Sequence, residues 1–122
     1  MPELKSVERF IAMVETNKHD EAIEQFYTLD ASMQENQDEP RVGRDGLVAR
    51  ERKVLSNARS VFSKCIYPFF INEDFVVIRW QFHFEWKDGT RNDMEEIAYQ
   101  QWKNELIHRE QFFYDPKQRN KI

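Results

Sequence analysis

The stretch FVVIRWQFHFEWKDGTRNDMEEIAYQQW, residues 75–102, decides the fold. Apolar and polar residues alternate through much of it with a period of two, which is typical of β-strands. An Asp-Gly pair at Asp88-Gly89 interrupts the alternation and is a strong signal of a hairpin turn. The stretch therefore predicts two long antiparallel strands, over 75–86 and 92–102.

The first of these strands has one aromatic face. The residues that share it are Trp80, Phe82, Phe84 and Trp86, and the opposite face carries Arg79, Gln81, His83 and Glu85. Because side chains of a strand alternate between the two faces of a sheet, we expect the aromatic row to face the core.

Two further strands, over 61–71 and 106–115, flank this hairpin, and Pro116 ends the last one. Residues 117–122 are expected to be a frayed tail. Apolar residues at helical spacing predict helices over 4–16, 19–27 and 45–58, with a short strand over 30–36 and a loop over 38–40. Three helices followed by an antiparallel meander form an α+β layout, and long strands curl as their twist accumulates.

Length and composition limit what the protein is. The 122 residues predict a single domain over 1–122, and 40% hydrophobic content with ten Phe predicts an ordered core. A net charge of −4, interspersed along the chain, argues against nucleic acid as a partner. No run reaches the roughly 18 apolar residues that span a bilayer, so we expect no membrane partner. The lone Cys65 and a polar start predict a cytoplasmic protein.

The pairing of the last two strands decides where Glu96 and Glu110 point. A three-residue loop with a bulge would pair Trp102 with Leu106 and so Ala98 with Glu110, which puts both glutamates on one face. A two-residue turn would instead put Glu110 opposite Tyr99. Periodicity alone leaves both registers open, because both faces are mixed.

Short motifs occur in a characteristic order along nearly the whole chain. They are Val7-Glu8-Arg9-Phe10-Ile11, Phe26-Tyr27-Thr28-Leu29-Asp30-Ala31, Glu39-Pro40-Arg41-Val42-Gly43-Arg44, and a close made of Trp102, Ile107, Phe113, Tyr114 and Asp115. On these motifs the sequence resembles the ketosteroid isomerase-like and SnoaL-like polyketide cyclase proteins of the nuclear transport factor 2-like superfamily. The resemblance implies a cone-shaped α+β barrel, in which three N-terminal helices pack on a curved antiparallel sheet and leave an apolar pocket. It also implies a homodimer formed through the outer sheet face.

The resemblance selects the bulged register and makes the face with Glu96 and Glu110 the pocket face. It places the isomerase's general base on Glu35 and its two oxyanion-hole donors on Phe10 and Ala98, neither of which can donate a hydrogen bond. The last-strand aspartate of the cyclases corresponds to Phe112. Proton abstraction next to a ketone needs donors for the developing charge, so we expect neither chemistry in its known form.

The candidate catalytic residues are the carboxylates Glu35, Glu96 and Glu110. Close carboxylates in an apolar pocket can hold a proton near neutral pH and act as acid and base. The alternative is that they orient a ligand or serve the structure. His108 and Glu110 offer only two metal ligands, fewer than the usual three or four, so we expect neither a metal nor a cofactor.

The many aromatic residues of the pocket face suit a small apolar or aromatic molecule. The residues expected to contact it are Phe10, Tyr27, Trp80, Phe82, Gln100, Trp102, Phe112 and Tyr114. If the protein is an enzyme, the sequence predicts cofactor-free isomerisation or cyclisation by proton transfer. The alternative is a non-catalytic ligand-binding or interaction module that uses the outer sheet face for dimerisation.

Overall fold

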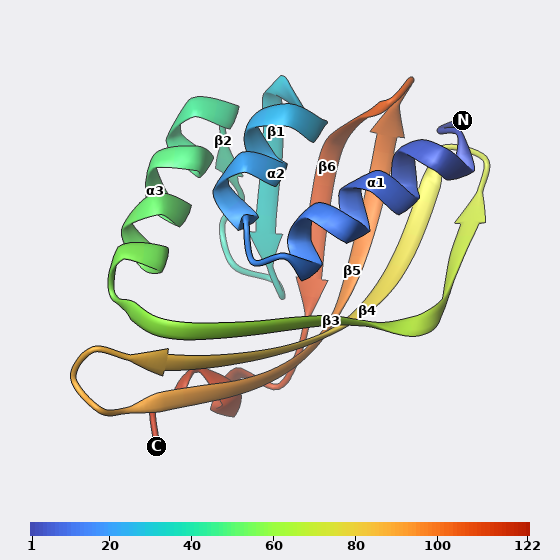
Figure 1. Ribbon diagram of the computed structural model, residues 1–122. Coiled ribbons are helices and arrows are strands. Elements are labelled where there is room, and N and C mark those ends of the chain that lie inside the picture. Colours follow the sequence, from blue (N-terminus) through green and yellow to red (C-terminus); the bar gives the residue numbers. More distant parts are fainter.

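The computed structural model describes residues 1–122 and shows three α-helices on one side of a six-stranded sheet (Figure 1). The helices are α1 (Leu4–Glu15), α2 (His19–Phe26) and α3 (Arg44–Ser56). The strands are β1 (Tyr27–Glu35), β2 (Arg41–Val42), β3 (Ala58–Asn72), β4 (Phe75–Trp86), β5 (Arg91–Lys103) and β6 (Leu106–Phe113), followed by the short 3-10 helix η1 (Pro116–Arg119). The predicted α+β class, with three helices on a curved sheet, is confirmed.

The sheet differs from the prediction in two respects. Its order is β2-β1-β6-β5-β4-β3, and β1 runs parallel to β6, so the sheet is mixed rather than antiparallel. It is also open, with β2 and β3 at its edges, rather than a closed barrel. Local turn signals predict hairpins between consecutive strands, but they carry no information about which distant strand β1 joins. The parallel pairing places Glu35 beside Phe112.

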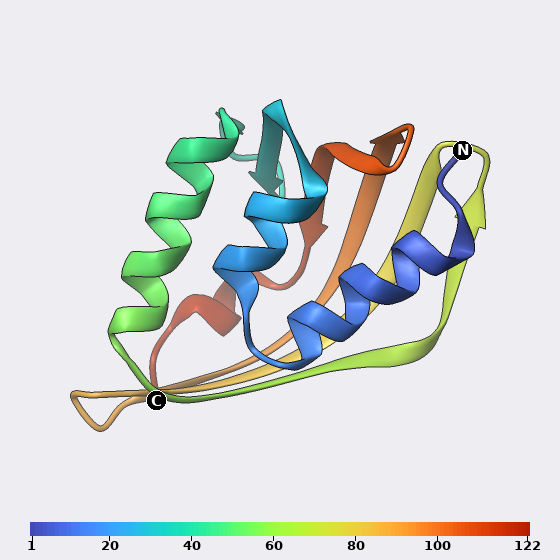
Figure 2. The same cartoon turned by 45° about the horizontal axis from the view of Figure 1, so that its top comes forward.

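The helices bury their apolar stripes against the sheet, and Figure 2 shows all three on the same side of it. In α1 the buried residues include Val7, Phe10, Ile11 and Val14, at the spacing of one helical face. Gly43 precedes α3 with a φ of 109°, a backbone conformation that favours glycine. Eighteen buried apolar residues form one core between the helices and the sheet. No helix has both the length and the apolarity needed to cross a membrane.

The β5–β6 hairpin follows neither of the two registers considered from the sequence. Lys103 pairs with Leu106 across a two-residue turn, in which Asn104 takes a positive φ of 58°. Asparagine tolerates this conformation, which explains the tight turn. Trp102 then pairs with Ile107, whereas Gln101 pairs with Arg109, so His108 is an extra residue in β6.

This bulge restores the predicted faces beyond it. Gln100 pairs with Glu110 and Ala98 with Phe112, so the even-numbered residues of both strands share the inner face. Before the bulge the faces are exchanged: Ile107 is buried, and His108 turns away to Thr28 and Asp30. His108 and Glu110 therefore do not come together as a pair of metal ligands.

The predicted frayed tail is instead tied to the sheet. The backbone of Ile122 exchanges two hydrogen bonds with that of Arg91, at 2.9 and 3.0 Å. The side chain of Asn92 donates to the backbone carbonyl of Gln118 at 2.9 Å. The turn of η1 thus lies against the start of β5 and brings Arg119 close to Tyr114.

Candidate functional site

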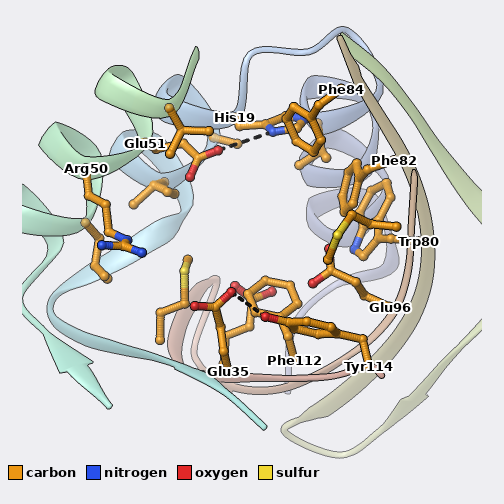
Figure 3. A pocket seen from close by; sticks show the side chains of 18 of the residues that line it. His19, Glu35, Arg50, Glu51, Trp80, Phe82, Phe84, Glu96, Phe112 and Tyr114 are labelled. Atoms are coloured by element: carbon orange, nitrogen blue, oxygen red, sulfur yellow. Dashed lines mark hydrogen bonds and ion pairs between the residues drawn. The ribbon is translucent and has the colours of Figure 1, made fainter. Parts of the chain in front are cut away.

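A cavity of about 470 Å³ lies between the helices and the inner face of the sheet (Figure 3). Fifteen of its 25 lining residues are hydrophobic, and they come from all three helices and from β1, β4, β5 and β6. Small-molecule sites typically have volumes of about 300–1,000 Å³ and mostly apolar walls. The cavity has the size and the lining of such a site.

The aromatic row of β4 forms one wall of this cavity. The rings of Trp80 and Phe82 stack with centroids 5.4 Å apart, and those of Phe84 and Trp86 stack with centroids 5.1 Å apart. Because stacked rings on one strand face each other along that strand, their edges point toward the cavity. Ring edges carry the positive end of the aromatic quadrupole and attract the π face of another ring. The wall therefore suits a flat aromatic ligand.

Glu96 projects into the cavity from β5, where it pairs with Trp80 of β4 (Figure 3). Its carboxyl group has no hydrogen-bond or ion-pair partner within the protein. Burial, and to a lesser extent the charges of Glu35 and Glu110, raise the pKa of Glu96 to about 8. Near neutral pH this carboxyl group therefore carries a proton and is free to contact a ligand.

Glu110 also borders the cavity but is already engaged by the protein. Its side chain accepts hydrogen bonds from the Tyr27 hydroxyl and, at 2.6 Å, from Nε2 of Gln100. Gln100 Oε1 in turn accepts a bond from Trp102 Nε1 at 2.9 Å. Burial raises the pKa of Glu110 by more than the bonds from Tyr27 and Gln100 lower it, and the resulting pKa is about 7. This network fixes Glu110 in place.

Glu35 lies at the end of β1, and both oxygens of its carboxyl group are engaged. It accepts a hydrogen bond from the Tyr114 hydroxyl at 2.8 Å and one from Arg41 Nη1 at 3.1 Å. Arg119 donates to the same Tyr114 oxygen at 2.7 Å. Glu35 thus lines the same cavity as Glu96, but its carboxyl group is held by neighbouring donors.

The helical side of the cavity carries polar residues that the sequence analysis did not identify. His19 begins α2, and Arg50 and Glu51 belong to α3. The Nδ1 atom of His19 lies 3.5 Å from Glu51 Oε1. Helical spacing contained the signal, because Glu51 follows Leu47 by four residues and precedes Val54 by three, on the inward face. His19 likewise precedes Ile23 by four.

The structure brings most of the predicted site residues to this cavity. All three candidate carboxylates line it, as do six of the predicted ligand contacts: Phe10, Tyr27, Trp80, Phe82, Phe112 and Tyr114. Gln100 and Trp102 are buried in the core and do not line the cavity. Their part is to hold Glu110.

No protein-family model matches the sequence, and no curated protein has a matching sequence. Solved structures resemble the fold. A protein of Mesorhizobium loti assigned as a SnoaL-like polyketide cyclase is 20% identical, with a TM-score of 0.76 over 93% of this chain and 100% of its own. A nuclear transport factor 2-like protein of unknown function from Burkholderia pseudomallei is 10% identical, with a TM-score of 0.75 over 92% of this chain and 89% of its own.

A third similar structure is a Catenulispora acidiphila protein with a ketosteroid isomerase-like fold, solved with trimethylamine. It is 15% identical, with a TM-score of 0.76 over 94% of this chain and 88% of its own. The chain thus has the nuclear transport factor 2-like fold, in agreement with the resemblance seen in its sequence. At these identities the likeness concerns the fold alone, and the same fold hosts many functions.

Proposed function

We propose that the protein binds a small, mostly apolar molecule in the cavity and catalyses a proton transfer on it without a cofactor, as an isomerase or a cyclase does. The observation that carries this proposal is the unpartnered carboxyl group of Glu96 within an aromatic cavity of about 470 Å³. Burying such a group without a partner costs free energy. A ligand that accepts its hydrogen bond would recover that cost.

Glu96 and Glu35 would divide the chemistry between them. Two carboxyl groups whose surroundings favour opposite protonation states form an acid and a base. Glu96 would donate a hydrogen bond to a carbonyl oxygen of the ligand, and the carboxylate of Glu35 would take a proton from a neighbouring carbon. Phe10 and Ala98 cannot stabilise the resulting enolate, so Glu96 would supply that donor instead.

A suitable test is the exchange of hydrogen for deuterium in 2-tetralone, a flat aromatic ketone with acidic C–H groups, dissolved in D₂O. We expect the protein to accelerate the exchange. Glu35→Gln and Glu96→Gln should each lower the rate by about 10²-fold or more, the usual contribution of an acid or base. The matched control is Glu95→Gln, because Glu95 adjoins Glu96 but pairs with Arg79 on the outer face.

Two outcomes would contradict the proposal in different ways. Binding of 2-tetralone without accelerated exchange would leave a ligand-binding protein that is not this enzyme. Failure of 2-tetralone and of other flat aromatic compounds to bind in the cavity would remove the binding function as well.

The outer face of the sheet supports a second proposal, a homodimer. Its exposed apolar residues include Phe62, Tyr67, Phe70, Ile97, Tyr99 and Phe113. Ile97 lies opposite Phe113 on the neighbouring strand, and the rings of Phe75 and Tyr99 are 5.5 Å apart. Exposed apolar patches of this kind mark interaction sites. Arg79 and Glu95 on this face form an ion pair and neutralise each other. This pair therefore adds no net charge that would repel the same face of a second copy.

A further inference from the structure

The imidazole ring of His19 is held firmly on one side. Ser63 donates its hydroxyl proton to Asn17 Oδ1 at 2.8 Å, and Ser63 Oγ lies 2.7 Å from His19 Nε2. A hydroxyl group has one proton to donate, so the Ser63 oxygen accepts from Nε2–H of His19. In the neutral ring the proton is therefore on Nε2, and Nδ1 presents a lone pair.

The Nδ1 atom on the other side of the ring makes no hydrogen bond within the protein. Nδ1 of His19 lies 3.5 Å from Glu51 Oε1, which exceeds the usual N–H···O range of about 2.7–3.2 Å. The His19 side chain is 10% exposed and that of Glu51 is 23% exposed, and both line the cavity. In the neutral form of the ring, a lone pair and a carboxylate oxygen thus lie side by side on the cavity wall, and both accept hydrogen bonds. Such a pair can bind a hydrogen-bond donor of a ligand.

The aromatic wall connects this pair with Glu96. The ring of His19 lies 5.3 Å from that of Phe82 and 6.2 Å from that of Phe84, both edge-on. Trp80, next along the same wall, pairs with Glu96. Figure 3 shows the His19–Glu51 pair and Glu96 on different sides of the cavity, with Phe82 and Trp80 between them. The cavity therefore has an accepting end and a donating end, joined by an aromatic surface.

We propose that His19 Nδ1 and Glu51 form a binding subsite for a hydroxyl group of the ligand. This inference rests on the proposed function and adds the class of ligand to it. The ligand is a flat aromatic compound with a hydroxyl group at one end, whose single proton is shared between His19 Nδ1 and the Glu51 carboxylate, and a carbonyl group at the other, which accepts from Glu96.

A purely structural role for His19 explains the contact of Nε2 with Ser63 but not the surroundings of Nδ1. The bond to Ser63 ties the start of α2 to β3, and it needs only Nε2. Such a role gives no use to Nδ1 or to the nearby Glu51 carboxylate. The two roles differ in what they predict for ligand binding, because a structural tie affects all ligands alike.

Two probes that share one aromatic frame separate these roles. 2-Naphthol carries a hydroxyl donor, and 2-methoxynaphthalene carries none. We expect isothermal titration calorimetry to give a dissociation constant about tenfold lower for 2-naphthol, the effect of one hydrogen bond of about 1.4 kcal/mol. His19→Phe should abolish this preference, because it weakens the binding of 2-naphthol more than that of 2-methoxynaphthalene. Glu51→Gln should reduce the preference, since an amide oxygen accepts less strongly than a carboxylate.

The control variant is His83→Phe, because His83 pairs with Asp93 on the outer face of the sheet. It should keep the full preference for 2-naphthol. Nitrogen-15 spectra add a direct readout: 2-naphthol, but not 2-methoxynaphthalene, should shift the Nδ1 resonance of His19. Circular dichroism verifies that each variant is folded. If His19→Phe does not fold, the loss of preference in Glu51→Gln tests the subsite.

Equal affinities of the two probes for the wild-type protein would overturn the subsite and leave the cavity proposal intact. Equal weakening of both probes by a folded His19 or Glu51 variant would do the same. Failure of both probes to bind the wild-type protein would overturn the proposed function and the subsite together.

Discussion

The carboxyl groups of Glu96 and Glu110 project from neighbouring strands into one cavity, yet only that of Glu110 is held by the protein. Tyr27 and Gln100 donate to Glu110, which is 3% exposed, whereas nothing donates to Glu96. Both oxygens of Glu110 are engaged in this way, so its carboxyl group fixes its neighbours. A carboxyl group with none engaged is available to a ligand. The two glutamates thus have different parts in the site.

The unpartnered Glu96 should make stability depend on pH. Its folded-state pKa of about 8 lies above the ordinary value of 4.5. Below about pH 4.5 the carboxyl group is protonated in both states, so its burial as an anion costs nothing there. As the pH rises toward 8, the unfolded chain loses this proton while the folded chain keeps it, and the free energy of unfolding falls.

Glu96→Gln removes this titration. The unfolding free energy of the variant minus that of the wild-type protein should be larger near pH 8 than near pH 4.5, by at least about 1 kcal/mol. Each unit of raised pKa is worth about 1.4 kcal/mol. Urea unfolding at the two pH values measures the effect. Glu95→Gln, on the outer face, should show no such gain. A pH-independent difference between Glu96→Gln and wild type would contradict the raised pKa.

Tyr27→Phe should destabilise the protein more at high pH than at low pH. The hydroxyl group of Tyr27 donates to Glu110 and lowers its pKa, so it stabilises the ionised form. Without it, we expect a loss of about 1–3 kcal/mol above about pH 7, where Glu110 is ionised in the folded protein, and a smaller loss near pH 4. Tyr99→Phe is the control, since Tyr99 is exposed on the outer face. Equal losses from Tyr27→Phe at both pH values would mean that its hydroxyl does not act through Glu110.

Much of the fold could be predicted because its signals are local. The alternation from Arg79 to Trp86 and the Asp88-Gly89 turn identify β4 and its hairpin, and the aromatic row faces the helices as expected. The inner face of β5 and β6 also followed, through the resemblance. For β4 and its hairpin, the residues that carry the signal lie within a few positions of the feature.

The remaining features depend on residues that are distant in the sequence. The bulge at His108 forms because a tight turn at Asn104 must be reconciled with burial of both Ile107 and Glu110. No turn motif reveals such a compromise. The parallel contact of β1 with β6 and the ties of the tail to β5 join segments that are distant in the sequence. The His19–Glu51 pair likewise appears only when α2 and α3 pack together.

A larger side chain at Val54 should block the cavity. Val54 lines it from α3, so Val54→Trp should fill space that a ligand needs. We expect the affinity for 2-methoxynaphthalene to fall at least tenfold. The free energy of unfolding should fall by no more than about 1–3 kcal/mol, the usual cost of one overpacked side chain. Leu29→Trp is the control, because Leu29 is 65% exposed. Unchanged affinity in Val54→Trp would show that the probe binds elsewhere.

Ile97→Arg should prevent the proposed dimer. Ile97 lies within the exposed apolar patch of the outer face, opposite Phe113. In an isologous dimer each copy would bury its new guanidinium without a partner, and an unpaired buried charge typically costs about 3–5 kcal/mol. Sedimentation velocity should show a dimer for the wild-type protein and a monomer for Ile97→Arg. Val42→Arg, an exposed change on β2 at the far edge of the sheet, should leave the dimer intact. A monomeric wild-type protein would contradict the proposed dimer. A dimer that persists in Ile97→Arg would place the contact between the two copies elsewhere.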